Sequence, residues 1–189
     1  GNSSNTGPGR NAGPVPIISY DPKTGKFTQE YVVKDEQIDL IYNFDGQLYV
    51  PGHDPKESWN LGNFYRLEAD GKWQKHRNLP GGIHNYAMAW DGKRLFAGLG
   101  TKKGAIVAVS EDKGKTWTTN KMTGGRVYSL LTIGDTVCAG SMILVMPKSS
   151  KRRKYSYAPL YGYKNGKFER LKDISSEDLL PDTHPEPKK

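Results

Sequence analysis

The chain has 189 residues, of which 35% are hydrophobic, and its 28 lysines and arginines outnumber 20 acidic residues, for a formal net charge of +8. It has no run of about 18 apolar residues, which excludes a membrane-spanning helix. The single cysteine, Cys138, excludes an internal disulfide and a cysteine-based zinc site.

The two ends of the chain differ in composition from its middle. Residues 1–15 begin GNSSNTGPGR, which lacks the apolar region of a signal peptide, and we expect a flexible segment there. Residues 174–189 carry three prolines in the last nine positions, so we expect a proline-rich tail. The folded part is therefore predicted to span residues 16–173.

The middle of the chain alternates short runs of Val, Ile, Tyr, Phe and Trp with glycine-containing turns, which predicts β-hairpins throughout. Four hairpins have Gly-Lys shortly before an aromatic residue, and their glycines are 46, 43 and 52 residues apart: Gly25, Gly71, Gly114 and Gly166. A second hairpin type lies between them, with turns at 45–46, 91–92 and 134–135. Two hairpins per repeat make four strands, which is the size of a β-propeller blade.

The repeats predict an all-β chain of about three and a half four-stranded antiparallel blades, at about 16–37, 38–82, 83–125 and 126–173. In a propeller, the second hairpin type would supply the inner strands and the Gly-Lys type the outer strands. Small residues in the inner hairpins, such as Ala97 and Gly98, suit the crowded central axis of a propeller. Four outer hairpins accompany only three inner ones, and propellers have about four to eight blades. We therefore expect a part of a larger propeller, with missing blades from the rest of the protein, or completion by self-association. A fold that is not a propeller remains the alternative.

One turn carries a family resemblance. The segment SEDKGKTW matches Ser-x-Asp-x-Gly-x-Thr-Trp at all five fixed positions, which are Ser110, Asp112, Gly114, Thr116 and Trp117. It resembles the Asp-box of sialidase-like (BNR-repeat) β-propellers, and the other repeats keep only degenerate forms of it. The resemblance implies the propeller fold over most of 16–173 and a structural role for these residues on the outer rim. We expect Asp112 to accept backbone hydrogen bonds, and Trp73 and Trp117 to be buried.

A sialidase site is not expected, because such a site needs three arginines and only Arg126 lies at the start of an inner strand. Two sets of loops on one propeller face nevertheless collect functional side chains. The candidate ligand-binding residues are His53, Asp54, Trp59, His84, Tyr86, Arg126 and Tyr128. The same loops carry Gln37, Asp39, Thr101, Lys102 and Lys103.

This mixture suits an anionic sugar, because aromatic rings stack on its apolar face while arginine and lysine pair with carboxylate or sulfate. A His/Tyr pair can also act as base and acid in a polysaccharide lyase. Alternatively, His84 and Tyr86 fill and cap the inner strand, and His53 is a hydrogen-bonded turn residue. No spacing predicts a metal site or a cofactor.

A basic insertion lengthens the last repeat. No acidic residue occurs from Thr136 to Phe168, and the cations that we expect to bind polyanions are Lys148, Lys151, Arg152, Arg153 and Lys154. Their field attracts sulfated or phosphorylated polymers, including heparin-like glycans, acidic algal polysaccharides and nucleic acid. A solvated loop without a partner is the alternative.

These features favour a non-catalytic binding or scaffold propeller that recognises an acidic glycan, in a secreted or periplasmic location. The alternative is a fragment of a glycan-processing enzyme, either a sialidase-like glycoside hydrolase or a polysaccharide lyase. A third hypothesis is a protein that associates with polyanions or nucleic acid through the basic insertion.

Overall fold

The computed structural model describes residues 2–3, 14–53, 60–145 and 154–174. This part of the chain is all-β and contains no helix, so it also has no helix that could cross a membrane. The expected flexible N-terminal segment, apart from residues 2–3 and 14–15, lies outside the described residues, as does all of the proline-rich tail except residue 174.

A hairpin opens the fold. It consists of β2 (Val15–Asp21) and β3 (Lys26–Val33), and the short strands β1 (Asn2–Ser3) and β4 (Gln37–Ile38) pair with each other. Three up-and-down units of four antiparallel strands then follow in chain order. The antiparallel all-β prediction is confirmed.

Each unit is a simple meander. The first unit contains β5 (Tyr42–Phe44), β6 (Gln47–Pro51), β7 (Leu61–Leu67) and β8 (Trp73–Pro80). The second contains β9 (Gly82–Trp90), β10 (Leu95–Thr101), β11 (Gly104–Ser110) and β12 (Thr118–Lys121). The third contains β13 (Arg126–Ile133), β14 (Thr136–Val145), β15 (Lys154–Lys164) and β16 (Lys167–Ile174).

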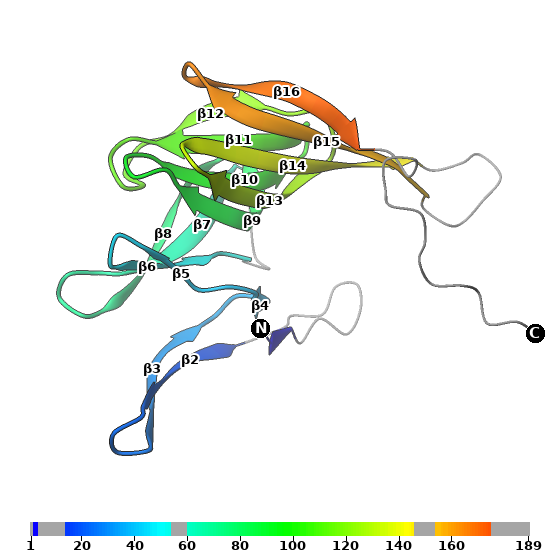
Figure 1. The fold of residues 1–189 in the computed structure, drawn as a ribbon. Helices are drawn as coiled ribbons and strands as arrows, with labels where there is room; N and C mark the ends of the chain where they lie inside the picture. Colours follow the sequence, from blue (N-terminus) through cyan, green and yellow to red (C-terminus); the bar gives the residue numbers. More distant parts are fainter. Residues whose placement is uncertain (1, 4–13, 54–59, 146–153, 175–189) are drawn as a thin grey trace, which may run out of the picture.

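The second and third units join into one sheet. Gly100 of β10 pairs with Arg126 of β13, and this contact makes an eight-stranded sheet that curls into a half-barrel (Figure 1). A Cβ at Gly98 would lie 2.8 Å from Cγ1 of Val127, so the close approach of these two strands requires glycine. The first unit lies between the curled sheet and the β2–β3 hairpin.

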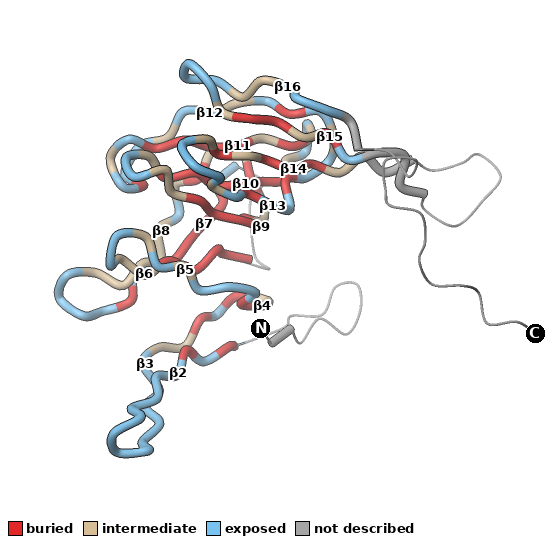
Figure 2. The backbone as a smooth tube through the Cα atoms, viewed as in Figure 1, coloured by how far each residue is buried: buried red, intermediate tan, exposed pale blue. Residues whose placement is uncertain are grey.

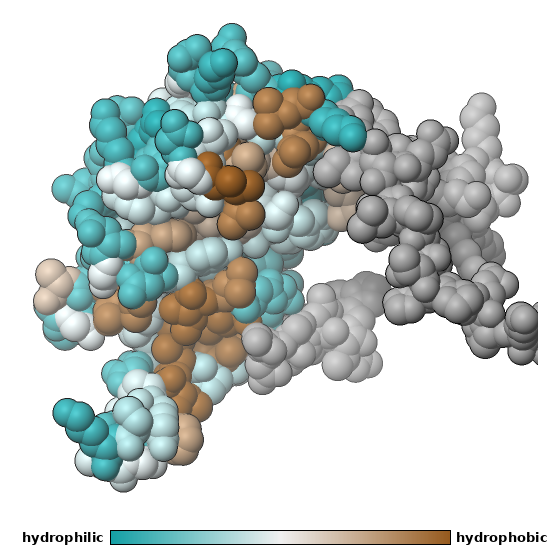
Figure 3. Space-filling view, in the orientation of Figure 1, coloured by the Kyte–Doolittle hydropathy of each residue, from teal (hydrophilic) through white to brown (hydrophobic). Residues whose placement is uncertain are grey.

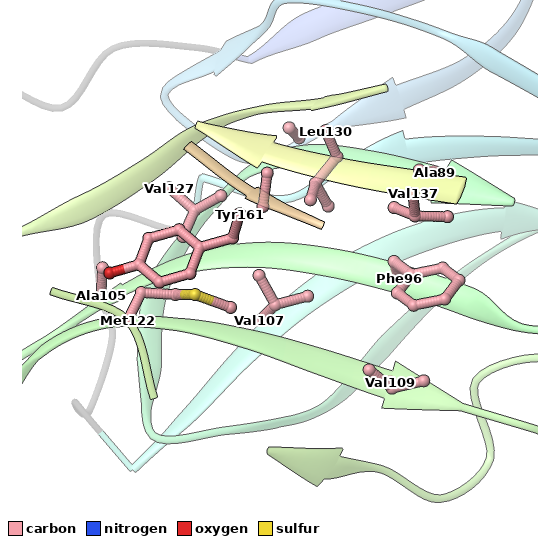
Figure 4. Close-up of a cluster of buried hydrophobic side chains, with 12 residues drawn as sticks. Ala89, Phe96, Ala105, Val107, Val109, Met122, Val127, Leu130, Val137 and Tyr161 are labelled. Atoms are coloured by element: carbon pink, nitrogen blue, oxygen red, sulfur yellow. The ribbon is translucent and has the colours of Figure 1, made fainter. Parts of the chain in front are cut away.

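The core is divided into three clusters, one between each pair of successive layers. Strand β10 explains how this happens, because its side chains alternate between two faces. Phe96 packs against the third unit, while Leu95 and Ala97 pack against the first unit. Figure 4 shows the cluster inside the curled sheet, where the Tyr161 ring lies against Met122. Both faces of the second unit are therefore covered.

The tight turns have the backbone geometry that the sequence predicts. Asp45 and Gly46 have φ angles of 52° and 77°, and Asn165 and Gly166 have 51° and 84°. Asparagine, aspartate and glycine tolerate this left-handed region, which matches the twist of the flanking strands. The chemistry of these turns thus sets where each hairpin reverses.

The turn from Ser110 to Trp117 is held by its own side chains. Asp112 accepts hydrogen bonds from the amides of Lys115 and Thr116, at 3.0 and 2.9 Å, and from the Thr116 hydroxyl at 2.6 Å. The Ser110 hydroxyl accepts the Gly114 amide at 2.7 Å. The hydrogen bond from the Thr116 hydroxyl, together with those from backbone amides, holds the pKa of Asp112 well below its usual range. The expected backbone hydrogen bonds to Asp112 are confirmed.

The two tryptophans expected to be buried differ. Trp73 is 8% exposed and belongs to the cluster beneath the β2–β3 hairpin, which confirms that expectation. The expectation is wrong for Trp117, which is only partly buried. One edge of its ring meets Phe64 of the first unit at 5.9 Å between centroids, while the ring also lines a pocket with Glu111 and Tyr163.

Large apolar side chains remain exposed at both ends of this stack of layers. Figure 2 shows the far end of the β2–β3 hairpin exposed along both strands, and Phe27 there is 69% exposed. Leu131 and Ile133 are exposed on β13. Figure 3 shows apolar surface where the hairpin meets the strands above it. Exposed apolar surface of this kind is what the expected self-association would cover.

Candidate functional site: a histidine–tyrosine cluster

Five of the seven predicted ligand-binding residues lie together in the structure. They are His53, which follows β6, His84 and Tyr86 on β9, and Arg126 and Tyr128 on β13. We call these five residues the His–Tyr cluster. The other two, Asp54 and Trp59, lie outside the described residues.

The rings of the cluster form a continuous row. The His53 and His84 rings lie 4.9 Å apart between centroids, and Tyr86 meets both histidines edge-on. The Tyr128 ring then lies 4.7 Å from Tyr86. His84 Nδ1 and the Tyr86 hydroxyl are 3.1 Å apart, which is within hydrogen-bonding distance. Exposure rises along the row from buried His53 to exposed Tyr128.

Arg126 supplies the guanidinium of the cluster. Its guanidinium carbon lies 5.4 Å from the centroid of the Tyr86 ring, and Nη1 donates to the Tyr128 hydroxyl at 3.2 Å. A Cβ at Gly100 would lie 2.8 Å from Cγ of Arg126 and 3.3 Å from Cε2 of Tyr86. Glycine at this position therefore makes room for the two side chains to stack.

Acidic side chains on either side of β4 border the histidines. Asp39 Oδ2 lies 3.5 Å from Nε2 of His53, and Glu36 Oε2 lies 3.8 Å from Nε2 of His84. The sequence placed Asp39 among the loop residues of this face. Within the described residues, no group of three or more His, Cys, Asp or Glu side chains is arranged to hold a metal ion.

A buried carboxylate beneath the cluster was missed by sequence reasoning. Asp35 is 0% exposed and accepts four hydrogen bonds. The donors are the His53 amide at 2.8 Å, Asn63 Nδ2 at 2.9 Å, the Tyr65 hydroxyl at 2.6 Å and Lys75 Nζ at 3.0 Å. The amide of His53 is thus fixed by a group that does not itself reach the row of rings.

Buried polar atoms without hydrogen bonds gather beside the cluster. Among the described residues they include Nε2 of His53, Oδ1 of Asn63 and both amide atoms of Asn85, whose side chain is fully buried. Leaving such an atom unsatisfied costs about 1–3 kcal/mol, and functional sites are where such costs are tolerated.

Burial keeps His53 neutral. Loss of solvation, followed by repulsion from His84, lowers the pKa of His53 to about 4, although Asp39 and Asp35 act in the opposite direction. At neutral pH its imidazole has one nitrogen that accepts and one that donates. The cluster therefore combines two imidazoles, of which that of His53 is buried and neutral, with two phenols and a guanidinium.

The basic insertion is only partly within the described structure. Lys148, Lys151, Arg152 and Arg153 lie outside the described residues, and Lys154 is the first residue of β15.

Comparison of the sequence with protein-family models found no match, and comparison with curated proteins found none either.

Proposed function

We propose that this chain is a β-propeller module that binds an acidic saccharide at the His–Tyr cluster. The observation that carries the proposal is Arg126, whose guanidinium stacks on Tyr86 beside the exposed ring of Tyr128. Guanidinium pairs with carboxylate or sulfate through two parallel hydrogen bonds, and tyrosine rings stack on the apolar face of a sugar. The cluster offers both kinds of contact side by side.

Polar groups deeper in the cluster suit the hydroxyl groups of a sugar. His53 Nε2 and the Asn85 amide are buried and make no hydrogen bond within the described structure. Sugar hydroxyls both donate and accept, so they can satisfy an imidazole and an amide together. An acidic sugar with its charged group at Arg126 would stack on Tyr128, and its hydroxyls would lie toward His84, whose side chain is 19% exposed.

The propeller architecture is part of the same proposal. Three four-stranded meanders pack through apolar clusters on successive faces, as blades do, and the Ser110–Trp117 turn has the hydrogen bonds that its resemblance to the Asp-box implies. The exposed Leu131 and Ile133 on β13, together with Phe27, support further strands or a second copy covering these surfaces. Sedimentation at increasing concentration tests the second copy.

Calorimetric titration tests saccharide binding. The panel contains oligosaccharides of heparin, chondroitin sulfate, alginate and polygalacturonate, with dextran as the neutral control. Each is titrated into the wild-type chain, an Arg126→Gln variant and an Arg77→Gln variant, which removes the same charge from an exposed position on β8. Circular dichroism establishes that both variants keep the wild-type fold.

The proposal predicts binding of at least one acidic oligosaccharide, no binding of dextran, and a loss of about tenfold or more in affinity with Arg126→Gln alone. Equal losses in the two arginine variants would show that only net charge matters. Failure of every acidic saccharide to bind, or equal binding of dextran, would overturn the proposal.

A second candidate function, elimination by a polysaccharide lyase, is favoured by the 3.1 Å contact between His84 Nδ1 and the Tyr86 hydroxyl. In such a reaction a base removes the proton next to the uronate carboxyl group, and an acid protonates the departing glycosidic oxygen. The His84 imidazole and the Tyr86 phenol are the groups that would take these two roles, while Arg126 stabilises the carboxylate. Appearance of an unsaturated uronate, followed by ultraviolet absorbance, tests it, and Tyr86→Phe should abolish the signal.

A further inference from the structure

A cationic pocket opens between the first and second units, where the end of β8 lies against the β10–β11 turn and β12. Its volume is about 510 Å³, and lysines supply the charge of its described lining: Lys102, Lys103 and Lys121. The described residues that line it include no acid. All three lysines are exposed, so their ammonium groups face solvent around the pocket.

The pocket adjoins the cluster along two neighbouring strands. On β10, Gly100 is in register with His84 of β9 and with Arg126 of β13. The next residue, Thr101, pairs with Gly82 and lines the pocket. Strand residues are spaced by about 3.3 Å, so Thr101 places the lining of the pocket one residue along β10 from Gly100, at the end of the strand. A ligand longer than one sugar unit can therefore reach both.

The lining matches a sugar unit that carries a negative charge. Ile106, Met122 and Pro80 give the pocket apolar walls, against which the carbon-bound hydrogens of a sugar ring can pack. Three lysines with no described acid among them create a positive field that concentrates carboxylate or sulfate groups. Lysine acts here as a point charge, which suits both a planar carboxylate and a tetrahedral sulfate. The volume lies within the range of about 300–1,000 Å³ common for small-molecule sites.

We propose that this pocket is a second subsite for an acidic sugar unit, so that the ligand of the chain is an acidic oligosaccharide or polysaccharide rather than a single acidic sugar. This inference rests on the proposed function of the His–Tyr cluster. The cluster holds one charged unit at Arg126, and a neighbouring unit along the same chain occupies the lysine pocket.

Oligosaccharide length separates the two subsites. Disaccharides and hexasaccharides of heparin and of polygalacturonate are titrated into the wild-type chain and a Lys103→Ser/Lys121→Ser variant. The matched control is Lys93→Ser/Lys115→Ser, which removes the same charge from exposed turn positions whose known hydrogen bonds use only the backbone. Thermal melting establishes that both double variants are folded.

We expect one of the hexasaccharides to bind the wild type about tenfold more tightly than its disaccharide, and the pocket variant to lose this advantage while its affinity for the disaccharide changes less than about twofold. The control should behave as wild type. The subsite is refuted if the pocket variant binds the hexasaccharide as tightly as wild type, or if both double variants weaken it equally. If Arg126→Gln still abolishes disaccharide binding in that case, the proposed function stands and only the subsite fails. If neither length binds the wild type, both proposals fail.

Discussion

Replacing Asp35 with alanine should destabilise the fold more than any surface change. Its carboxylate is fully buried, and the substitution leaves four donors, including the Lys75 ammonium, without their acceptor. Removing one partner of a fully buried ion pair costs about 3–5 kcal/mol, and because the Lys75 side chain is 30% exposed we expect a loss near the lower end, about 3 kcal/mol, out of the roughly 5–15 kcal/mol that stabilises a typical domain. The Asp35→Asn variant should lose less, because its amide oxygen still accepts hydrogen bonds.

Urea denaturation followed by tryptophan fluorescence measures this loss, with Glu111→Ala as an exposed acidic control expected to stay within about 0.5 kcal/mol of wild type. Saccharide affinity should also fall in Asp35→Asn. The Asp35 carboxylate accepts a hydrogen bond from the backbone amide of His53, and weakening this bond should displace the His53 ring from its place in the cluster. A loss below about 1 kcal/mol in Asp35→Ala would show that the four hydrogen bonds do not hold this loop in place.

Because burial lowers the pKa of His53 from 6.5 to about 4, its stabilising contribution is complete above pH 6.5 and is lost as the pH falls toward 4. Denaturation of wild type against His53→Gln should show a difference of up to about 3 kcal/mol across this interval, and parallel pH profiles would contradict it. Trp73→Ala should lower the free energy of unfolding by about 3–5 kcal/mol, and Trp117→Ala, which removes a partly buried ring, by about 2 kcal/mol. Urea denaturation measures both losses, and a larger loss for Trp117→Ala would refute the packing of the two rings. Changing residues 151–154 together to serine should flatten the salt dependence of heparin binding, and an unchanged slope would make the basic insertion a solvated surface.

Local patterns made much of the fold predictable. The hairpins could be placed because Asp-Gly and Asn-Gly turns fix the left-handed backbone geometry that was found, for example at Asp45 and Asn165. Because the same hairpins repeat along the chain, the starts of equivalent strands, such as β9 and β13, can be aligned with each other. That correspondence alone groups His84, Tyr86 and Arg126 on one face of the fold.

The remaining features depend on contacts between distant parts of the chain. Nothing in the local sequence distinguishes Asp35 from the neighbouring acidic residues, since its partners come from β7, β8 and the segment after β6. The sequence around Gly100 gives no sign that glycine is required there. The requirement comes from the Arg126 and Tyr86 side chains, which pack where a Cβ of this residue would lie. The pattern around Trp117 predicts that its ring packs on a neighbouring sheet. It does not predict how much of the ring that sheet covers, and for this reason full burial was the wrong expectation.

Imidazole signals in nuclear magnetic resonance spectra test the central claim most directly. His76 on β8 is a built-in control, because its ring stacks on Phe64 at 4.9 Å and its Nε2 lies 2.6 Å from Glu68, outside the His–Tyr cluster. During titration with the heparin and polygalacturonate hexasaccharides, we expect the signals of His53 and His84 to shift in a saturable way while those of His76 stay in place. Absence of any shift at His53 and His84, or an equal shift at His76, would contradict acidic-saccharide binding at the cluster.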